Sequence, residues 1–256
     1  MRIFLKNKVF SMLLIVLLLV GLLGGCAFLF NVKQNEESSQ EKTDSSTDIV
    51  DISTLTYIAF GDSITYGWDS SISARMDKPY PTCVADELGL KAFSNEGISG
   101  STITLIEGLP DINSQVQNAT AGYDIVSVMI GVNDFSRSAK LGTTADTGLS
   151  TVYGSLNTLV AKLKAKYPDA YIFFITPLPC HNESLNSSTL GVSLEEVVLA
   201  IKDVCNRNAI DVLDLNASGK FTMENDPFSD GIHPSQTFIK QYTAPQIATF
   251  IKENYK

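Results

Sequence analysis

Two side chains that could carry out nucleophilic chemistry stand far apart in this sequence, each beside a suitable partner. Ser63 follows an apolar run and Gly61 in the stretch AFGDSITYGW, and His233 follows Asp230 by three residues in DGIH. A serine hydroxyl is a poor nucleophile until a base removes its proton, which histidine does near neutral pH. A carboxylate can hold the imidazole in the right tautomer. These residue types predict Ser63 as nucleophile, His233 as general base and Asp230 as the group that orients the base.

The sequence offers one other histidine for this role. His181 has Glu183 two residues later, in an expected loop, which is a weaker arrangement than that of His233. We therefore expect His233 to be the base. His181 follows the fourth predicted strand and has two interpretations, either a residue that lines the substrate cleft or a histidine at its rim or on the surface. Trp68, the only tryptophan, has two interpretations, either an aromatic wall of that cleft or a core residue.

Alternating strands and helices should position these residues. Short apolar or β-branched runs predict strands, and amphipathic runs between them predict helices. Strands are expected at residues 56–60, 91–95, 124–131, 170–176 and 210–215, and helices at 81–88, 150–166, 193–206 and 245–255. A capping box of Ser193 and Glu196 marks the third helix, and Thr243 is expected to cap the fourth. This order predicts a parallel sheet covered on both faces, with binding sites outside the carboxyl ends of the strands.

Glycine-rich and polar segments directly follow the predicted strands. Gly97 and Gly100 lie in NEGISGST after the second strand, and Asn133 and Asp134 lie in GVND after the third. A backbone N–H beside a glycine can approach an oxyanion closely, because no Cβ intervenes, and an asparagine amide can add a second donor. We interpret Asp62 and Asp134 as acids that brace their turns.

These segments together resemble the four sequence blocks of the SGNH, or GDSL-type, hydrolases. GDSIT at residues 61–65, the glycine of ISGS, GVND at 131–134 and DGIH at 230–233 occur in the family's order. One block alone is weak evidence for the family, but four blocks in order, each after a predicted strand, are a specific signal. The first block has Ile64 where many members have leucine, which keeps an apolar side chain there. An α/β-hydrolase elbow fits less well, because the G-x-S-x-G pattern lacks its last glycine.

The resemblance covers about residues 55–256 and implies a three-layer α/β/α sandwich with a five-stranded parallel sheet of the flavodoxin-like type. It implies ester hydrolysis without a metal or other cofactor, through the serine, histidine and aspartate identified above. It also implies an oxyanion hole formed by the N–H groups of Ser63 and Gly100 and the side chain of Asn133. Gly100 is preferred over Gly97 by its place in the I-S-G pattern.

The N-terminal segment predicts export. A basic head is followed by an apolar stretch, which is the pattern of a secretory signal. The LGGC motif resembles a bacterial lipobox, which implies a signal peptide at residues 1–25 and lipid on Cys26. The alternative is an uncleaved anchor helix over residues 9–30, long enough to span ~30 Å of hydrocarbon.

Both alternatives lead to the same domain organisation. Residues 26–54 are rich in Ser, Glu, Gln, Thr and Asp, so we expect a flexible polar linker. Residues 55–256 should form the hydrolase domain. We expect this domain to be extracytoplasmic and tethered to the cell membrane by lipid or by the anchor helix.

Charge and cysteine content restrict the partners. A formal net charge of −9 disfavours nucleic acid and suits small-molecule or carbohydrate esters. Apart from Cys26, the cysteines are Cys83, Cys180 and Cys205, which allow at most one intramolecular disulfide and leave its pairing open. No CxxC motif or Cys/His cluster predicts a metal site. The oligomeric state also stays open.

The sequence favours an extracytoplasmic serine esterase that removes short acyl groups, such as acetyl, from carbohydrate or small esters. Short loops after most predicted strands suggest an open site, which supports short acyl groups. An acyltransferase with the same triad, or a lysophospholipase or thioesterase, is the alternative. A non-catalytic surface lipoprotein is less consistent, because we would expect it to lack a triad or oxyanion residue.

Overall fold

The computed structural model describes residues 50–186, 191–225 and 230–256 of the 256-residue chain. The predicted signal peptide, anchor helix and lipidated Cys26 lie outside these residues, as does most of the linker. The last part of the predicted linker is described, and Ile52–Thr54 form a 3-10 turn. Ile52 packs against the core, so the compact unit begins at Val50, slightly before the predicted boundary.

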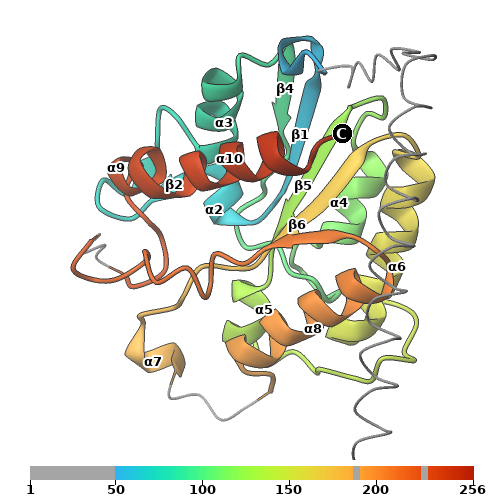
Figure 1. The fold of residues 1–256 in the computed structure, drawn as a ribbon. Coiled ribbons are helices and arrows are strands. Elements are labelled where there is room, and N and C mark those ends of the chain that lie inside the picture. Colours follow the sequence, from blue (N-terminus) through green and yellow to red (C-terminus); the bar gives the residue numbers. More distant parts are fainter. Residues whose placement is uncertain (1–49, 187–190, 226–229) are drawn as a thin grey trace, which may run out of the picture. The chain divides into compact units, whose positions relative to one another are not determined.

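A five-stranded parallel sheet forms the centre of this unit, in the order β4-β1-β5-β6-β7 (Figure 1). Its strands are β1 (Thr56–Gly61), β4 (Ala92–Asn95), β5 (Ile125–Met129), β6 (Tyr171–Ile175) and β7 (Asp211–Leu213). Counted along the chain, this is the 2-1-3-4-5 order of flavodoxin-like folds. The predicted fold class is therefore confirmed. A short antiparallel ribbon, β2 (Trp68–Asp69) with β3 (Ala74–Arg75), is separate from the sheet.

Helices cover both faces of the sheet, as Figure 1 shows. Their bounds are α2 Ser63–Tyr66, α3 Tyr80–Leu88, α4 Ile112–Asn118, α5 Val132–Ser136, α6 Val152–Lys166, α7 Glu183–Asn186, α8 Leu194–Arg207, α9 Gln236–Phe238, a π-helical turn Ile239–Thr243 and α10 Ala244–Asn254. Residues in α4, α6 and α8 pack on one face, and residues in α3 and α10 pack on the other.

The two faces follow from the two-residue period of a strand. In β1, Ile58 and Phe60 join the core under α4, α6 and α8, whereas Tyr57 and Ala59 join the core under α3 and α10. All four side chains are fully buried. A strand buried on both faces needs a continuous apolar run, which explains why β1 was visible in the sequence.

The helix start signals are confirmed at one position and wrong at another. Ser193 accepts a hydrogen bond from the N–H of Glu196, whose side chain bonds back to Ser193, so the predicted capping box is present. Thr243 makes no cap, because its backbone is already helical. The helical path begins earlier, where Ser235 accepts a hydrogen bond from Phe238, and a π-turn carries it into α10. The sequence pattern did not show this upstream turn.

In the described part of the chain, no helix is long and apolar enough to cross a membrane. The thiols of Cys83 and Cys205 form no disulfide.

Candidate active site

Ser63 stands at the carboxyl end of the central strand β1, as the first residue of α2. Asp62 caps this helix, because its carboxylate accepts a hydrogen bond of 2.9 Å from the N–H of Ile64. Gly67 ends the helix after one turn with φ of +96°, a left-handed conformation that glycine adopts without strain. The short helix therefore holds Ser63 in a fixed backbone conformation, and only 6% of the residue is exposed.

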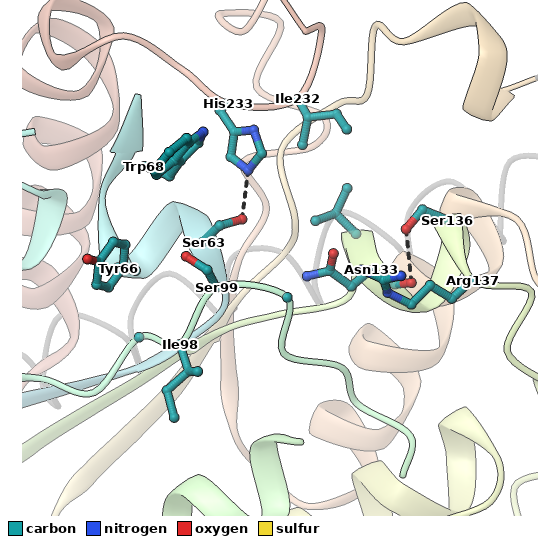
Figure 2. A pocket seen from close by; sticks show the side chains of 13 residues that line it. Ser63, Tyr66, Trp68, Ile98, Ser99, Asn133, Ser136, Arg137, Ile232 and His233 are labelled. Carbon is teal, nitrogen blue, oxygen red and sulfur yellow. Dashed lines mark hydrogen bonds between the residues drawn. The ribbon is translucent and has the colours of Figure 1, made fainter. Parts of the chain in front are cut away.

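His233 lies beside the serine although 170 residues separate them in the chain. The Oγ atom of Ser63 is 2.7 Å from Nε2 of His233 (Figure 2). Nδ1 of His233 is 2.6 Å from Oδ2 of Asp230. The predicted nucleophile, base and carboxylate are thus brought together in one hydrogen-bonded row. This is the geometry that lets a histidine take a proton from a serine while a carboxylate fixes its ring.

The turn from Asp230 to His233 fixes the carboxylate as well as the ring. The second oxygen of Asp230 accepts the N–H groups of Ile232 at 3.0 Å and of His233 at 2.9 Å. Partial burial acts to raise the pKa of Asp230, but the hydrogen bonds from the side chain and backbone of His233 and from Ile232 outweigh it and lower the pKa. Asp230 is therefore a carboxylate at neutral pH.

His181 and Asn182 lie behind this turn. The N–H of His181 donates to the carbonyl of Gly231 at 2.7 Å, and the Asn182 amide donates to the carbonyl of Asp230 at 2.9 Å. A Cβ on Gly231 would lie 2.7 Å from the Asn182 nitrogen, so only glycine allows this close packing. The segment after β6 thus supports the backbone on which His233 is carried.

The structure corrects the prediction that His181 lines the substrate cleft. Its ring stacks on Phe221, with 5.6 Å between the ring centroids, and its Nε2 lies 2.9 Å from the Phe221 carbonyl oxygen. It is not among the described residues that line the cavity in front of Ser63. The prediction for His181 depended only on its position after a strand. The backbone hydrogen bond to Gly231 turns the side chain away from the cavity.

A cavity of about 700 Å³ opens in front of the serine (Figure 2). Its lining comes from the segments that follow β1, β4, β5 and β7, namely Ser63, Tyr66, Trp68, Gly97, Ile98, Ser99, Gly100, Val132, Asn133, Ser136, Arg137, Ile232 and His233. Trp68 therefore takes the first of its two predicted roles, as part of the wall. The volume is in the range of small-molecule sites.

Three hydrogen-bond donors face this cavity beside the serine. Within the described residues, the structure gives no acceptor to the N–H of Ser63 or of Gly100. The side-chain amide of Asn133 donates one hydrogen to the Ser101 carbonyl at 2.9 Å, which fixes its direction and leaves its second N–H for another acceptor. These are the three predicted oxyanion donors, and they come from three different loops.

Two other side chains, Asp134 and Asn95, brace those loops, and for Asp134 this is the predicted role. Asp134 is fully buried and accepts hydrogen bonds from the N–H groups of Ile103 at 2.7 Å and Thr104 at 2.9 Å. Asn95 donates to the Thr65 carbonyl at 2.8 Å and accepts from the N–H of Gly97 at 3.0 Å. Each therefore ties one strand-end loop to a neighbour.

Burial disfavours the charged form of the two acids near the site. Burial raises the pKa of Asp62 to about 7 and that of Asp134 to about 6, although hydrogen bonds from backbone N–H groups act to lower both. Neither carboxylate bonds the serine or the histidine, so both brace the backbone as predicted.

Sequence reasoning missed Gln115, which lies beneath the site on α4. Its amide nitrogen donates to the carbonyl of Gly61 at 3.1 Å and to the hydroxyl of Ser101 at 2.5 Å. Gly61 precedes the serine loop, and the Ser101 carbonyl holds Asn133, so Gln115 connects the nucleophile to an oxyanion donor. Residues 112–118 carry no clear amphipathic pattern, so neither α4 nor this contact was predicted.

Among the described residues, no three His, Cys, Asp or Glu side chains are grouped closely enough to hold a metal ion.

Comparisons with known proteins agree with the fold. The sequence model of the GDSL-like lipase/acylhydrolase family matches residues 59–237. Among curated proteins, none matches the sequence.

Solved structures share the architecture. A Lactobacillus plantarum protein has a TM-score of 0.69 and 23% identity, over 79% of this chain and 99% of that one. The native aryl esterase of M. smegmatis has a TM-score of 0.61 and 18% identity, over 78% of this chain and 99% of that one. A carbohydrate acetylesterase family member from Sinorhizobium meliloti has a TM-score of 0.59 and 17% identity, over 78% of this chain and 98% of that one.

A fluorophosphonate probe should label Ser63 alone among the serines of the cavity. Ser63→Ala should abolish labelling, because among the described serines that line the cavity only Ser63 has its hydroxyl within hydrogen-bond distance of a histidine ring. Ser136→Ala is the matched control, since Ser136 lines the same cavity but its hydroxyl donates to the carbonyl of Asn133. Labelling is measured by mass spectrometry of the intact protein, and label remaining in Ser63→Ala would contradict the assignment.

Gln115→Met should slow this labelling roughly fivefold, because a net hydrogen bond is worth about 1 kcal/mol and tenfold corresponds to 1.4 kcal/mol. The variant keeps the length of the side chain and removes its donor to Gly61. Gln117→Met, at an exposed position of the same helix, should label at the normal rate. Circular dichroism establishes that both variants are folded, and a normal rate in Gln115→Met would refute the bracing role.

Proposed function

We propose that this chain, which belongs to the GDSL-like lipase/acylhydrolase family and is an ester-hydrolysing enzyme, acts through an acyl-enzyme on Ser63. The observation that carries the proposal is the row from Ser63 Oγ through His233 to Asp230, with separations of 2.7 and 2.6 Å, at the floor of an open cavity. Side chains in this order can generate an alkoxide-like nucleophile at neutral pH.

In the first half of the reaction, the Ser63 oxygen attacks the ester carbonyl while Nε2 of His233 accepts the hydroxyl proton. The carbonyl oxygen becomes an oxyanion and receives hydrogen bonds from the N–H groups of Ser63 and Gly100 and from the amide of Asn133. One such donor is worth about 3 kcal/mol of transition-state stabilisation. The tetrahedral intermediate then breaks its bond to the alcohol, which leaves with the proton from His233.

In the second half, water takes the place of the alcohol. His233 removes a proton from the water as it attacks the acyl group on Ser63, and the same donors stabilise the second oxyanion. Collapse of this intermediate releases the carboxylic acid and returns the proton to the serine. Asp230 stays ionised throughout, and its lowered pKa suits it to stabilise the imidazolium in both halves.

For the substrate, we propose esters with short acyl groups on carbohydrate or other small alcohols. Two observations support this. The cavity is open to solvent and is formed by loops that follow the strands, and structures of the same fold include a carbohydrate acetylesterase and an aryl esterase. We also propose that the domain works outside the cytoplasm on a membrane tether, because of the basic and apolar N-terminal sequence and its LGGC motif.

Asp230→Asn should lower kcat on 4-nitrophenyl acetate by about a thousandfold or more. Asp230 accepts two backbone N–H groups through one oxygen, so an asparagine should keep its oxygen there and turn its NH₂ toward Nδ1 of His233. That contact favours the tautomer with hydrogen on Nε2, which cannot take the serine proton. Asp203→Asn, which removes a surface carboxylate paired with Arg207, should leave kcat unchanged. Equal kcat in the two variants would refute the role of Asp230.

The acyl-length proposal is tested with 4-nitrophenyl acetate, butyrate, octanoate and dodecanoate. We expect kcat/KM to be highest for acetate or butyrate and to fall for the longer chains, with the rate in Ser63→Ala subtracted as background. Activity confined to octanoate and dodecanoate would show a long-chain lipase and overturn the short-acyl assignment while leaving the triad intact.

A further inference from the structure

Among the described residues that line the cavity in front of Ser63, Arg137 alone has a permanently charged side chain. The other lining residues are uncharged apart from the titratable His233, and several are apolar or aromatic. An arginine is always protonated in proteins, so the cavity carries a positive charge at every physiological pH. This is notable because the chain as a whole has a formal net charge of −9.

The guanidinium of Arg137 is not used elsewhere in the described part of the chain. No carboxylate there lies within ion-pair distance of it, and its side chain donates no hydrogen bond. Its backbone is well held, since its N–H donates to the carbonyl of Asp134, the residue clamped by Ile103 and Thr104. A fixed backbone thus carries an exposed cation that has no partner among the described residues.

The position of Arg137 relates it directly to the reacting atoms. It follows the oxyanion residue Asn133 by four positions at the end of α5, and side chains four residues apart lie on the same face of a helix. Figure 2 shows both side chains at the cavity, on the side opposite Trp68 and Tyr66. A substrate whose carbonyl oxygen meets Asn133 would therefore place its neighbouring groups near the guanidinium.

A second arginine near the cavity shows the contrast. Nε of Arg75 donates to the Tyr66 carbonyl at 2.9 Å, and its guanidinium carbon lies 4.6 Å from the centre of the Tyr66 ring. Arg75 is thus occupied in supporting one wall. Arg137 has no such contact and is left for a ligand.

We propose that Arg137 recognises an anionic group, a carboxylate or a phosphate, that the ester substrate carries next to its scissile bond. The planar fork of a guanidinium matches either group with two parallel hydrogen bonds. This inference rests on the proposed esterase function and narrows it to acidic esters, such as those of acidic sugars or dicarboxylic acids. Arg137 is then a specificity-determining residue.

A role in helix stability explains the arrangement less well. Cations favour the carboxyl end of a helix through its macrodipole, but α5 has five residues, and this role does not require the side chain to line the cavity. A neutral, hydroxyl-rich substrate could also accept hydrogen bonds from Arg137. The two possibilities differ in their response to charge. A site that recognises hydroxyl groups would not prefer an anionic ester over a neutral ester of the same size.

The test compares esters in pairs that differ in charge but hardly in size. On the acyl side, 4-nitrophenyl hemisuccinate is compared with 4-nitrophenyl butyrate. On the alcohol side, 4-acetoxybenzoate and 4-acetoxyphenyl phosphate are each compared with 4-acetoxybenzamide. The proteins are wild type, Arg137→Gln, Arg137→Lys and the control Lys91→Gln. Lys91 is an exposed cation just before β4, at the opposite edge of the sheet, so its loss changes the net charge equally.

The measured quantity is the ratio of kcat/KM for the anionic ester to that for its neutral partner, after subtraction of spontaneous hydrolysis. Arg137→Gln should lower this ratio roughly two- to fivefold in at least one pair, the effect of losing a solvent-exposed ionic contact. Arg137→Lys should recover part of it, Lys91→Gln should leave it unchanged, and added salt should reduce it in wild type. The pair that responds identifies the side of the ester and the kind of anion.

An unchanged ratio in Arg137→Gln for every pair would overturn the proposal, and so would equal losses on the anionic and neutral esters. If wild type hydrolyses the neutral esters normally in either case, the esterase function stands and only the anion preference fails. If wild type hydrolyses no ester and Ser63 takes no probe, the proposed function fails and this inference fails with it.

Discussion

The hydrogen bond between Ser63 and His233 depends on segments from opposite ends of the domain meeting at one sheet edge. β1 carries the serine, and the loop after β7 carries the histidine. A separation of 2.7 Å between their atoms can persist only if both backbones are fixed to within a fraction of an ångström. The parallel sheet gives the coarse arrangement, because all of its strands end at the same edge. The fine arrangement comes from polar side chains that bind backbone groups in the loops.

These polar side chains form one connected support. Gln115 binds both Gly61 and Ser101, and Ser101 in turn holds the amide of Asn133. Asp134, next to Asn133, clamps the N–H groups of Ile103 and Thr104. A buried carboxylate is expensive, as the raised pKa of Asp134 shows, but a loop amide left without a partner would also be costly. The charge is retained because it satisfies several donors at once and fixes the loop that supplies the oxyanion donors.

Much of this arrangement could be predicted from the sequence, because the relevant signals are local. The buried strands β1, β5 and β6 are continuous apolar runs, and the serine, asparagine and Asp-x-x-His segments each follow a strand directly. Contacts between loops were not predictable in this way. Gln115 acts from a helix with no clear apolar period, His181 is turned away by backbone pairing with Gly231, and Thr243 lies inside a helical path that starts at Ser235. Each depends on which segments meet in space, which a single sequence does not specify.

The central claim is that Ser63 carries the acyl group between the two halves of the reaction. The most direct measurement is to mix the protein with 4-nitrophenyl acetate, quench with acid during turnover, and map the acetyl group by peptide mass spectrometry. The account predicts one acetyl group on the peptide that contains Ser63 and none in Ser63→Ala. Steady hydrolysis with no acetyl on that peptide, or with acetyl on another residue, would contradict it.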